Sequence, residues 1–370
     1  MERKLFQAIS TLTGTVIGAG FLGIPYVVSK SGFLIGLVWM CLICIIMMFV
    51  NLTIGEIALS TKAMHQIPGY ASKYLGKKTK IFVFLASVFG LYAALVAYLI
   101  GEGESLSSLL TSSTNYSLLL GIGFWFILAL ITFKGIRWFK KIEPFAVLAV
   151  FLATLVLGII NWNRISFENL SYINSSYLFL PFGVVLFAFL GVSSIPEMER
   201  VLEKNEKLMK KAIIIGSLVP LFVYILFTLV VLGLYGFNIE EIATISFGKT
   251  VTLLGMFTMF TAFLALSLAL QDTYRFDFNI SQKKAWLLSV LLPLFTFVAI
   301  KIWNLADFVK ILSLGGSISG GLLGIAILLI HEHLKDKELE RKPEFRINFP
   351  LMLKILFIII FLVGILYEFL

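Results

Sequence analysis

The sequence predicts an all-α polytopic membrane protein. Of its 370 residues, 59% are hydrophobic and only 14% are charged, whereas a soluble domain carries about 25% charged residues. Apolar runs of about 20 residues, the length that a helix needs to cross a bilayer, recur along the whole chain between short polar breaks. This pattern excludes a soluble enzyme, a disordered chain and a nucleic-acid-binding protein, and it makes the lipid bilayer the expected environment.

Eleven apolar runs are candidate membrane spans, and little sequence remains between them for a folded aqueous domain. We therefore expect a single transmembrane domain over residues 1–370. The expected spans are Phe6–Val28, Phe33–Ile57, Ile81–Leu106, Ser117–Phe133, Ile142–Asn161, Tyr177–Ile195, Ala212–Leu234, Thr250–Leu270, Ala285–Ile302, Phe308–Ile330 and Pro350–Phe369.

The distribution of basic residues predicts the orientation. If the N-terminus is cytoplasmic, 25 of the 30 Lys and Arg residues fall in inner segments or at inner span ends, as the positive-inside rule requires. We therefore expect a multi-pass protein of the cell membrane with a cytoplasmic N-terminus and an extracytoplasmic C-terminus. The net charge of +9 is explained by this topology and does not indicate binding to nucleic acid.

The first and sixth spans contain helix-breaking residues at matching positions. The first reads TLTGTVIGAGFLGIPY, with Gly20 and Pro25, and the sixth reads VVLFAFLGVSSIPEM, with Gly191 and Pro196, 171 residues later. In a helix interior Gly costs about 1 kcal/mol and Pro about 3 kcal/mol relative to Ala, so we expect both helices to be interrupted. Paired interruptions in two halves of a chain are typical of a transporter binding site, although small residues also allow close helix packing.

Several motifs together resemble a known family: GTVIGAGFLGIPY, IGEIALSTK, PGYASKYLG, FAFLGVSSIPE and LALSLALQD. They resemble the amino acid/polyamine/organocation superfamily, most closely its aromatic and auxin-type amino acid permeases, over spans one to ten in order. This resemblance implies the LeuT-type fold of two five-helix inverted repeats. The repeats would cover about residues 5–162 and 176–330, and an extra C-terminal helix would cover about residues 350–369.

The same resemblance implies a substrate site at the two breaks. Backbone amides at the first break would bind a carboxylate, because a helix N-terminus favours an anion, and carbonyls at the second break would bind an ammonium group. A tyrosine hydroxyl from the third span would also reach the carboxylate. The residues implied are Gly18, Ala19 and Gly20 at the first break, Ala188, Phe189, Leu190 and Gly191 at the second, and Tyr92 in the third span.

The expected substrate is a small molecule, an amino acid with an apolar or aromatic side chain. No Asp, Lys or Arg lies in the middle third of any expected span, and a broken helix binds a zwitterion without a buried ionised side chain, which is costly in a bilayer. No cofactor is expected, but the coupling ion, Na⁺ or H⁺, is left open. A sodium site would be implied at the carbonyls of Gly14 and Ile17 and the hydroxyls of Thr258 and Thr261, unless those hydroxyls bond to their own helix.

Other polar residues are assigned weaker roles. Glu56, at the inner end of the second span, is expected to be a gate or structural residue. Glu102 and Glu104 are expected on a solvated outer rim, and the His331–His333 stretch in a solvated linker that binds no metal. The chain contains no HExxH, GxSxG or P-loop motif, so no catalytic residues are expected and the chain is not expected to be an enzyme.

These features together predict a secondary active transporter for amino acids that works by alternating access. The alternative is a membrane receptor that keeps the transporter fold and uses the site to sense an amino acid. Ligand binding without net flux would distinguish the receptor. The oligomeric state is not predicted.

Overall fold

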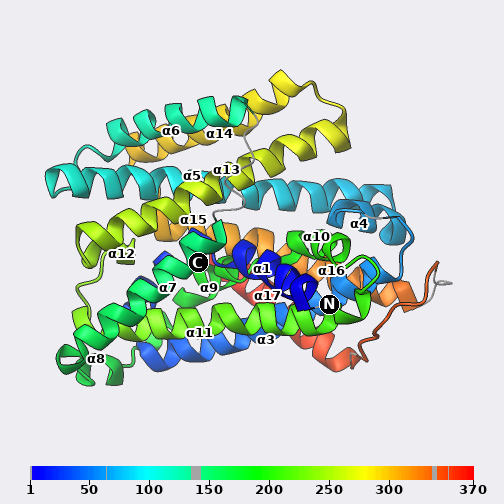
Figure 1. The fold of residues 1–370 in the computed structure, drawn as a ribbon, viewed down its shortest axis with the longest axis horizontal. Helices are drawn as coiled ribbons and strands as arrows, with labels where there is room; N and C mark the ends of the chain where they lie inside the picture. Colours follow the sequence, from blue (N-terminus) through cyan, green and yellow to red (C-terminus); the bar gives the residue numbers. More distant parts are fainter. Residues whose placement is uncertain (1, 64, 135–142, 336–339, 349) are drawn as a thin grey trace.

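The computed structural model describes residues 2–63, 65–134, 143–335, 340–348 and 350–370, and this part of the chain is helical, with no strand. The long helices run roughly along the long axis of the molecule, which α5 crosses almost from end to end (Figure 1). The helices that form the body of the molecule are α1 (Glu2–Val16), α2 (Ile24–Ser31), α3 (Phe33–Leu59), α5 (Lys77–Thr111), α6 (Ser117–Phe133), α7 (Glu143–Ile160), α9 (Leu180–Ala188), α11 (Met209–Tyr235), α13 (Lys249–Phe278), α14 (Gln282–Trp303), α15 (Phe308–Leu314), α16 (Gly321–Lys335) and α17 (Leu351–Tyr367).

Seven described helices are long and apolar enough to cross a membrane, and an eighth span is obtained if the helices on either side of the first break, bent by 47°, are taken together. Three further apolar helices are 17 residues or shorter: Ser117–Phe133, Phe151–Ile160 and Leu351–Tyr367. The protein is therefore a helical polytopic membrane protein, and the count of eleven spans stays a prediction. Most of the expected basic loop after Lys134 lies outside the described residues.

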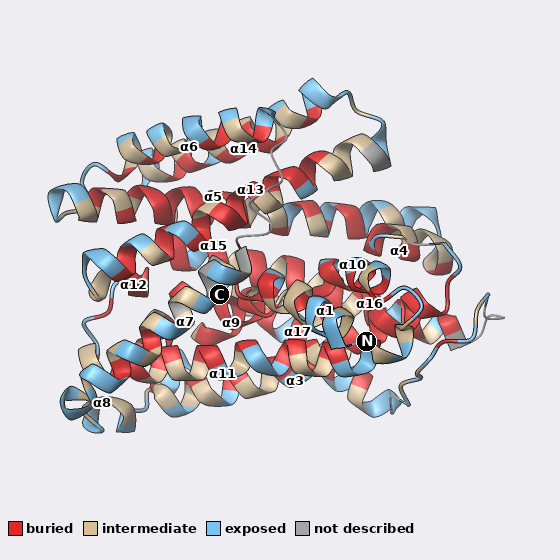
Figure 2. Cartoon of the chain, viewed as in Figure 1, coloured by how far each residue is buried: buried red, intermediate tan, exposed pale blue. Residues whose placement is uncertain are grey.

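The surface of the helix assembly suits a lipid environment. Burial is concentrated in the centre, whereas the outer helices such as α6 and α14 carry exposed stretches (Figure 2). The exposed side chains there are largely apolar, for example Leu119, Phe126 and Phe295. A water-soluble protein rarely exposes contiguous apolar surface on this scale.

Both helices that carry the Gly and Pro residues are interrupted. In the first, α1 ends at Val16, Gly18 is extended (φ −90°, ψ −153°), and the 3₁₀ turn η1 (Ala19–Gly23) leads into α2. In the second, α9 ends at Ala188, and the 3₁₀ turn η5 (Val192–Ser194) leads into α10 (Ile195–Val201). Pro25 and Pro196 lie in the first turns of α2 and α10, where a missing N–H is tolerated. The repeated sequence pattern therefore forms the same order of elements twice: a half-helix, a 3₁₀ turn and a second half-helix.

The glycine-rich stretch of the tenth expected span forms a π-helix, η7 (Gly315–Gly320), between α15 and α16. A Cβ atom built on Gly316 would lie 2.0 Å from the carbonyl oxygen of Gly183 in α9. Because only glycine allows such a close approach of two backbones, η7 packs directly against the first half of the second broken span.

Four segments meet at one end of the molecule. The Lys4 ammonium donates to the Glu203 carbonyl at 2.7 Å, and the Lys73 ammonium, from α4 (Ile67–Leu75), pairs with Glu340 at 2.6 Å. Arg341 lies within 4 Å of Glu199 and Glu206. The segment of residues 340–348 thus connects α4 to α10 and to the loop that follows α10, at the right of Figure 1.

The expectation that His331 lies in a solvated linker is wrong. Helix α16 continues to Lys335, and the His331 side chain is 1% exposed. Its Nε2 lies 3.2 Å from Oε2 of Glu56 at the end of α3. Helix α16 therefore continues beyond the apolar run that defined the expected span, and its added turn contacts Glu56 of α3.

Candidate substrate site at the two helix breaks

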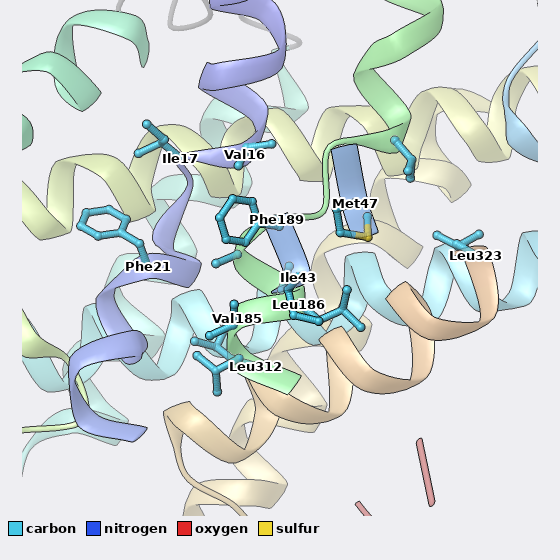
Figure 3. Packing of buried hydrophobic residues seen from close by; sticks show 14 of the residues in the cluster. Val16, Ile17, Phe21, Ile43, Met47, Val185, Leu186, Phe189, Leu312 and Leu323 are labelled. Carbon is cyan, nitrogen blue, oxygen red and sulfur yellow. The ribbon is translucent and has the colours of Figure 1, made fainter. Parts of the chain in front are cut away.

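The two breaks are in direct contact. A Cβ atom built on Gly20 would lie 3.0 Å from Cα of Ala188 and 2.8 Å from the ring of Phe187. On the other side, a Cβ atom built on Gly191 would lie 2.6 Å from the Leu12 side chain and 2.8 Å from that of Val16. Each break thus uses a glycine to approach the other broken helix, and Figure 3 shows Val16, Ile17 and Phe189 close together where both ribbons lose their helical coil.

One hydroxyl bridges the two breaks. Tyr224 of α11 is fully buried, and its hydroxyl oxygen lies 2.8 Å from the carbonyl oxygen of Val16 and 2.9 Å from that of Ala188. Both carbonyls belong to the last residue of a half-helix. The Val16 carbonyl also accepts the Gly18 N–H at 2.8 Å. The single proton of the Tyr224 hydroxyl is therefore shared between two carbonyls, and the Val16 carbonyl has a second donor.

Aromatic rings surround this hydroxyl. The Tyr224 ring stacks on Phe21 of η1 at a centroid distance of 6.0 Å and meets Phe189 edge-on at 5.1 Å. Phe227, one turn further along α11, contacts Phe21 edge-on at 5.1 Å. The rings come from both broken spans and from α11, so they form an apolar cluster next to backbone polar groups.

Two further polar side chains border the breaks. A Cβ atom on Gly18 would lie 3.3 Å from the Tyr98 hydroxyl of α5, and one on Gly191 would lie 3.6 Å from Nδ2 of Asn51 in α3. Asn51 is 2% exposed, and its amide oxygen has no hydrogen-bond partner in the described part of the chain. Tyr98 and Asn51 thus bring side-chain polar groups to the first and second break, respectively.

The structure places the Tyr92 hydroxyl away from the breaks. It lies 2.9 Å from the Tyr274 hydroxyl and donates to the Leu288 carbonyl at 3.1 Å, so it joins α5 to α13 and α14. Tyr98, six residues later on α5, is the tyrosine that reaches Gly18.

The remaining residues implied at the second break are mostly buried. Ala188 and Phe189 are 1% and 2% exposed, and the Leu190 N–H donates to the Phe187 carbonyl at 3.1 Å. At the first break Ala19 begins η1, but its side chain lies outside the described part. The 3₁₀ turn that follows Gly18 leaves its first N–H groups without partners inside the turn.

The residues implied for a cation site make local hydrogen bonds. The Thr258 hydroxyl donates to the Gly255 carbonyl at 2.7 Å, and the Thr261 hydroxyl contacts the carbonyls of Phe257 and Thr258 at 3.2 and 3.1 Å. Gly14 and Ile17 are buried at the end of the first half-helix and next to it. In this conformation both hydroxyls donate their protons to carbonyls of their own helix. Their oxygen lone pairs are the groups that a cation could bind.

Glu56 connects three segments at the end of α3. Its Oε2 accepts the Ile347 N–H at 2.8 Å and lies 3.2 Å from Nε2 of His331. The carboxyl group therefore connects α3 to α16 and to the segment of residues 340–348. Helices α4 and α10 contact the same segment at this end of the molecule.

Comparison with known proteins now identifies the family. Residues 1–246, about two thirds of the chain, match the tryptophan/tyrosine permease family. The chain belongs to this family. The resemblance to aromatic amino acid permeases is thereby confirmed, and the matched residues of this permease include both helix breaks.

Curated relatives of the permease include three amino acid transporters. The tyrosine-specific transport system 1 of Haemophilus influenzae is 27% identical over 314 residues, which cover 78% of this chain and 76% of the relative. The glutamine transporter 2 of Aliivibrio fischeri is 24% identical, over 63% of this chain and 62% of the relative. The amino acid transporter AVT3C of Arabidopsis thaliana is 24% identical, over 90% of this chain and 83% of the relative.

Three residues of this permease that border the breaks were not assigned to the site from sequence: Tyr224, Tyr98 and Asn51. The signal for Asn51 is an amide within an otherwise apolar run in α3. For Tyr224 the signal is a tyrosine four residues after Pro220 within the apolar run of α11, and for Tyr98 it is a second tyrosine in the helix that carries Tyr92.

Proposed function

We propose that this permease is a secondary active transporter of an amino acid with an apolar or aromatic side chain, driven by a proton or sodium gradient through alternating access. Membership of the tryptophan/tyrosine permease family supports transport of this class of substrate. The relatives named for tyrosine and glutamine transport support an amino acid as the transported solute.

The observation that carries the proposal is the hydroxyl of Tyr224 between the carbonyls of Val16 and Ala188. This hydroxyl joins the ends of both half-helices, and Gly20 of the first break lies against Ala188 of the second. The N–H groups after Gly18 would bind the substrate carboxylate and the carbonyls before Gly191 its ammonium group. A zwitterion is then bound without any ionised side chain, which a bilayer-spanning protein avoids.

The aromatic cluster supports an apolar or aromatic side chain on the substrate. The Tyr224 ring lies 6.0 Å from the Phe21 ring and 5.1 Å from the Phe189 ring beside the breaks. Such rings favour edge-to-face and offset contacts with another ring. In the bound state we assign Tyr98, instead of Tyr92, as the α5 hydroxyl nearest to the carboxylate, because Tyr98 borders Gly18.

The test is uptake of a panel of labelled amino acids into proteoliposomes under an imposed proton or sodium gradient. We expect concentrative uptake of a few apolar or aromatic amino acids, lost when the driving gradient is collapsed. Gly20→Leu and Gly191→Leu fill the contact between the broken helices and should abolish uptake. Gly123→Leu is the matched control, since a Cβ atom on Gly123 would have open space around it.

Three outcomes would contradict parts of the proposal. Normal uptake by both Gly20→Leu and Gly191→Leu would show that the substrate site lies elsewhere. Loss of uptake in Gly123→Leu as well would show that the effect is not specific to the breaks. Saturable binding without flux under either gradient would favour the receptor function.

A further inference from the structure

Glu102 of α5 is a carboxyl group enclosed by the protein. It is 0% exposed, and neither carboxyl oxygen has a hydrogen-bond partner in the described part of the chain. The backbone of Phe260 in α13 is a neighbouring polar group. The expectation that Glu102 lies on a solvated rim is therefore wrong, because three other helices cover it.

Glycines on either side of Glu102 allow this close packing. A Cβ atom on Gly101 would lie 2.5 Å from the Met259 sulfur of α13 and 3.1 Å from the Phe308 ring of α15. A Cβ atom on Gly103 would lie 2.4 Å from the Ser117 carbonyl oxygen of α6. Helices α6, α13 and α15 thus pack closely around this turn of α5, and the Glu102 side chain is fully buried.

The charged groups of the surrounding helices have other positions or partners. Glu104 pairs with Lys301 of α14 at 2.6 Å, and Lys310 of α15 pairs with Glu368 at 2.8 Å. Helix α6 carries no titratable side chain. The other titratable or charged groups on these elements make no described hydrogen bond or ion pair with Glu102. They are Lys77, Lys78, Lys80, Tyr92 and Tyr98 on α5, Lys249, Asp272, Tyr274 and Arg275 on α13, Lys283 and Lys284 on α14, and Asp307 and Glu241 near the start of α15. The side chain of Asp277, also on α13, lies outside the described part of the structure.

A carboxyl group in this setting is stable only when it is neutral. Burial of an unpaired charge costs far more than burial of a neutral polar group, and the described part of the chain provides no counter-charge. The packed conformation is therefore compatible with Glu102 as a neutral carboxylic acid. The charged carboxylate would require water or a rearrangement of the surrounding helices.

The position of Glu102 connects it to the substrate site. Residues four apart share a helix face, so Glu102 lies one turn from Tyr98, whose hydroxyl borders Gly18. Phe260, its neighbour on α13, lies between Thr258 and Thr261. A change in packing around Glu102 would therefore shift α5 and α13 where these helices lie next to the first break.

We propose that Glu102 is the proton-binding residue that couples a proton gradient to transport. This inference rests on the proposed function. In a conformation open toward the end of α5 at Thr111, the Glu102 carboxylate accepts a proton from water and becomes a carboxylic acid. The neutral group then permits the packed conformation seen here. In a conformation open to the opposite side, the acid returns the proton to water, so that one proton crosses in each cycle.

The test compares wild type with Glu102→Gln in proteoliposomes that contain a transported apolar or aromatic amino acid. Gln mimics the neutral acid but cannot release a proton. We expect Glu102→Gln to lose accumulation driven by a pH gradient, down to the level reached without a gradient, and to keep exchange of internal for external substrate. Glu104→Gln, two residues away on the same helix, should keep accumulation driven by the pH gradient.

Failure of the inference and failure of the proposed function give different results. If wild type neither accumulates nor exchanges any amino acid, the proposed function is wrong. If wild type accumulates substrate and Glu102→Gln responds to the pH gradient equally well, or if wild type follows only a sodium gradient, the inference is overturned. If Glu102→Gln does not fold, Glu102→Asp is used. A shifted pH dependence of accumulation in that variant supports the inference, and an unchanged one overturns it.

Discussion

The hydroxyl of Tyr224 donates to the carbonyl of Ala188 at a distance of 2.9 Å, at the residue where α9 ends. The same oxygen lies 2.8 Å from the Val16 carbonyl, which also accepts the Gly18 N–H at 2.8 Å. Tyr224→Phe therefore removes a donor from both carbonyls, and the Ala188 carbonyl is the one that loses more. A buried polar group without its partner costs about 1–3 kcal/mol. We expect a lower thermal unfolding temperature and weaker uptake.

Tyr235→Phe is the matched control for this prediction, because Tyr235 lies on the same helix and outside the breaks. Thermal unfolding in detergent and uptake in proteoliposomes measure the two effects. Equal behaviour of the two variants would show that the bridge between the breaks contributes nothing.

The two break glycines should differ in their tolerance of alanine. A Cβ atom on Gly20 meets backbone, Cα of Ala188 at 3.0 Å, as well as the Phe187 ring, whereas a Cβ atom on Gly191 meets the ends of the Leu12 and Val16 side chains. Side-chain ends move more easily than backbone, and overpacking costs about 1–3 kcal/mol. We expect Gly20→Ala to reduce uptake more than Gly191→Ala, with Gly123→Ala as the neutral control. The reverse order would contradict the contact between Gly20 and Ala188.

The segment of residues 340–348 should loosen at low pH. Glu340 accepts hydrogen bonds from the Lys73 ammonium and the Lys62 N–H, and these contacts lower the pKa of its carboxyl group. A carboxyl group whose pKa is lower in the folded state stabilises the fold above its unfolded pKa, and this contribution is lost as the pH falls through the folded pKa. We therefore expect amide exchange in this segment to be slow near neutral pH and to accelerate below the usual range of a Glu carboxyl group.

Glu340→Gln provides the comparison for the effect of pH. It should exchange faster than wild type at neutral pH and show a weaker change on acidification. Hydrogen–deuterium exchange of the segment measures both, and a wild type insensitive to acid would contradict the role of this contact.

Glu368 should anchor the last helix. Its side chain is 3% exposed and accepts hydrogen bonds from Lys310, Ser313 and Ser317, all on α15 or η7. Glu368→Gln weakens three contacts at once and should lower the free energy of unfolding by about 1–3 kcal/mol. Glu168→Gln, at the start of a short exposed helix, should leave thermal unfolding unchanged. Unfolding of Glu368→Gln at the wild-type temperature would show that the contacts contribute little.

The positions of the helices and of their interruptions could be predicted from the sequence. Apolar runs determine where a chain can cross a bilayer, and the costs of Gly and Pro determine where a helix ends. The structure ends α1 at Val16 and α9 at Ala188, next to the Gly-rich stretches that predicted the breaks. These features depend on local sequence, so no knowledge of neighbouring helices was needed.

The side chains that border the breaks could not be predicted in the same way. Helix α5 is apolar around most of its circumference, so hydropathy does not reveal its rotation, and Tyr92 was as reasonable as Tyr98 from sequence. The burial of Glu102 depends on two glycines that meet three other helices. The burial of His331 depends on Glu56, which is 275 residues away along the chain. Each of these outcomes is determined by tertiary contacts that local pattern does not encode.

The hydrogen bond between Lys4 and the Glu203 carbonyl links the outer ends of α1 and the segment after α10, while their inner ends meet at the breaks. The first half of one broken span and the second half of the other are therefore joined at both ends. We expect α1 and α10 to move as one unit when either broken helix changes conformation, so that a change in one half of the chain is passed to the other.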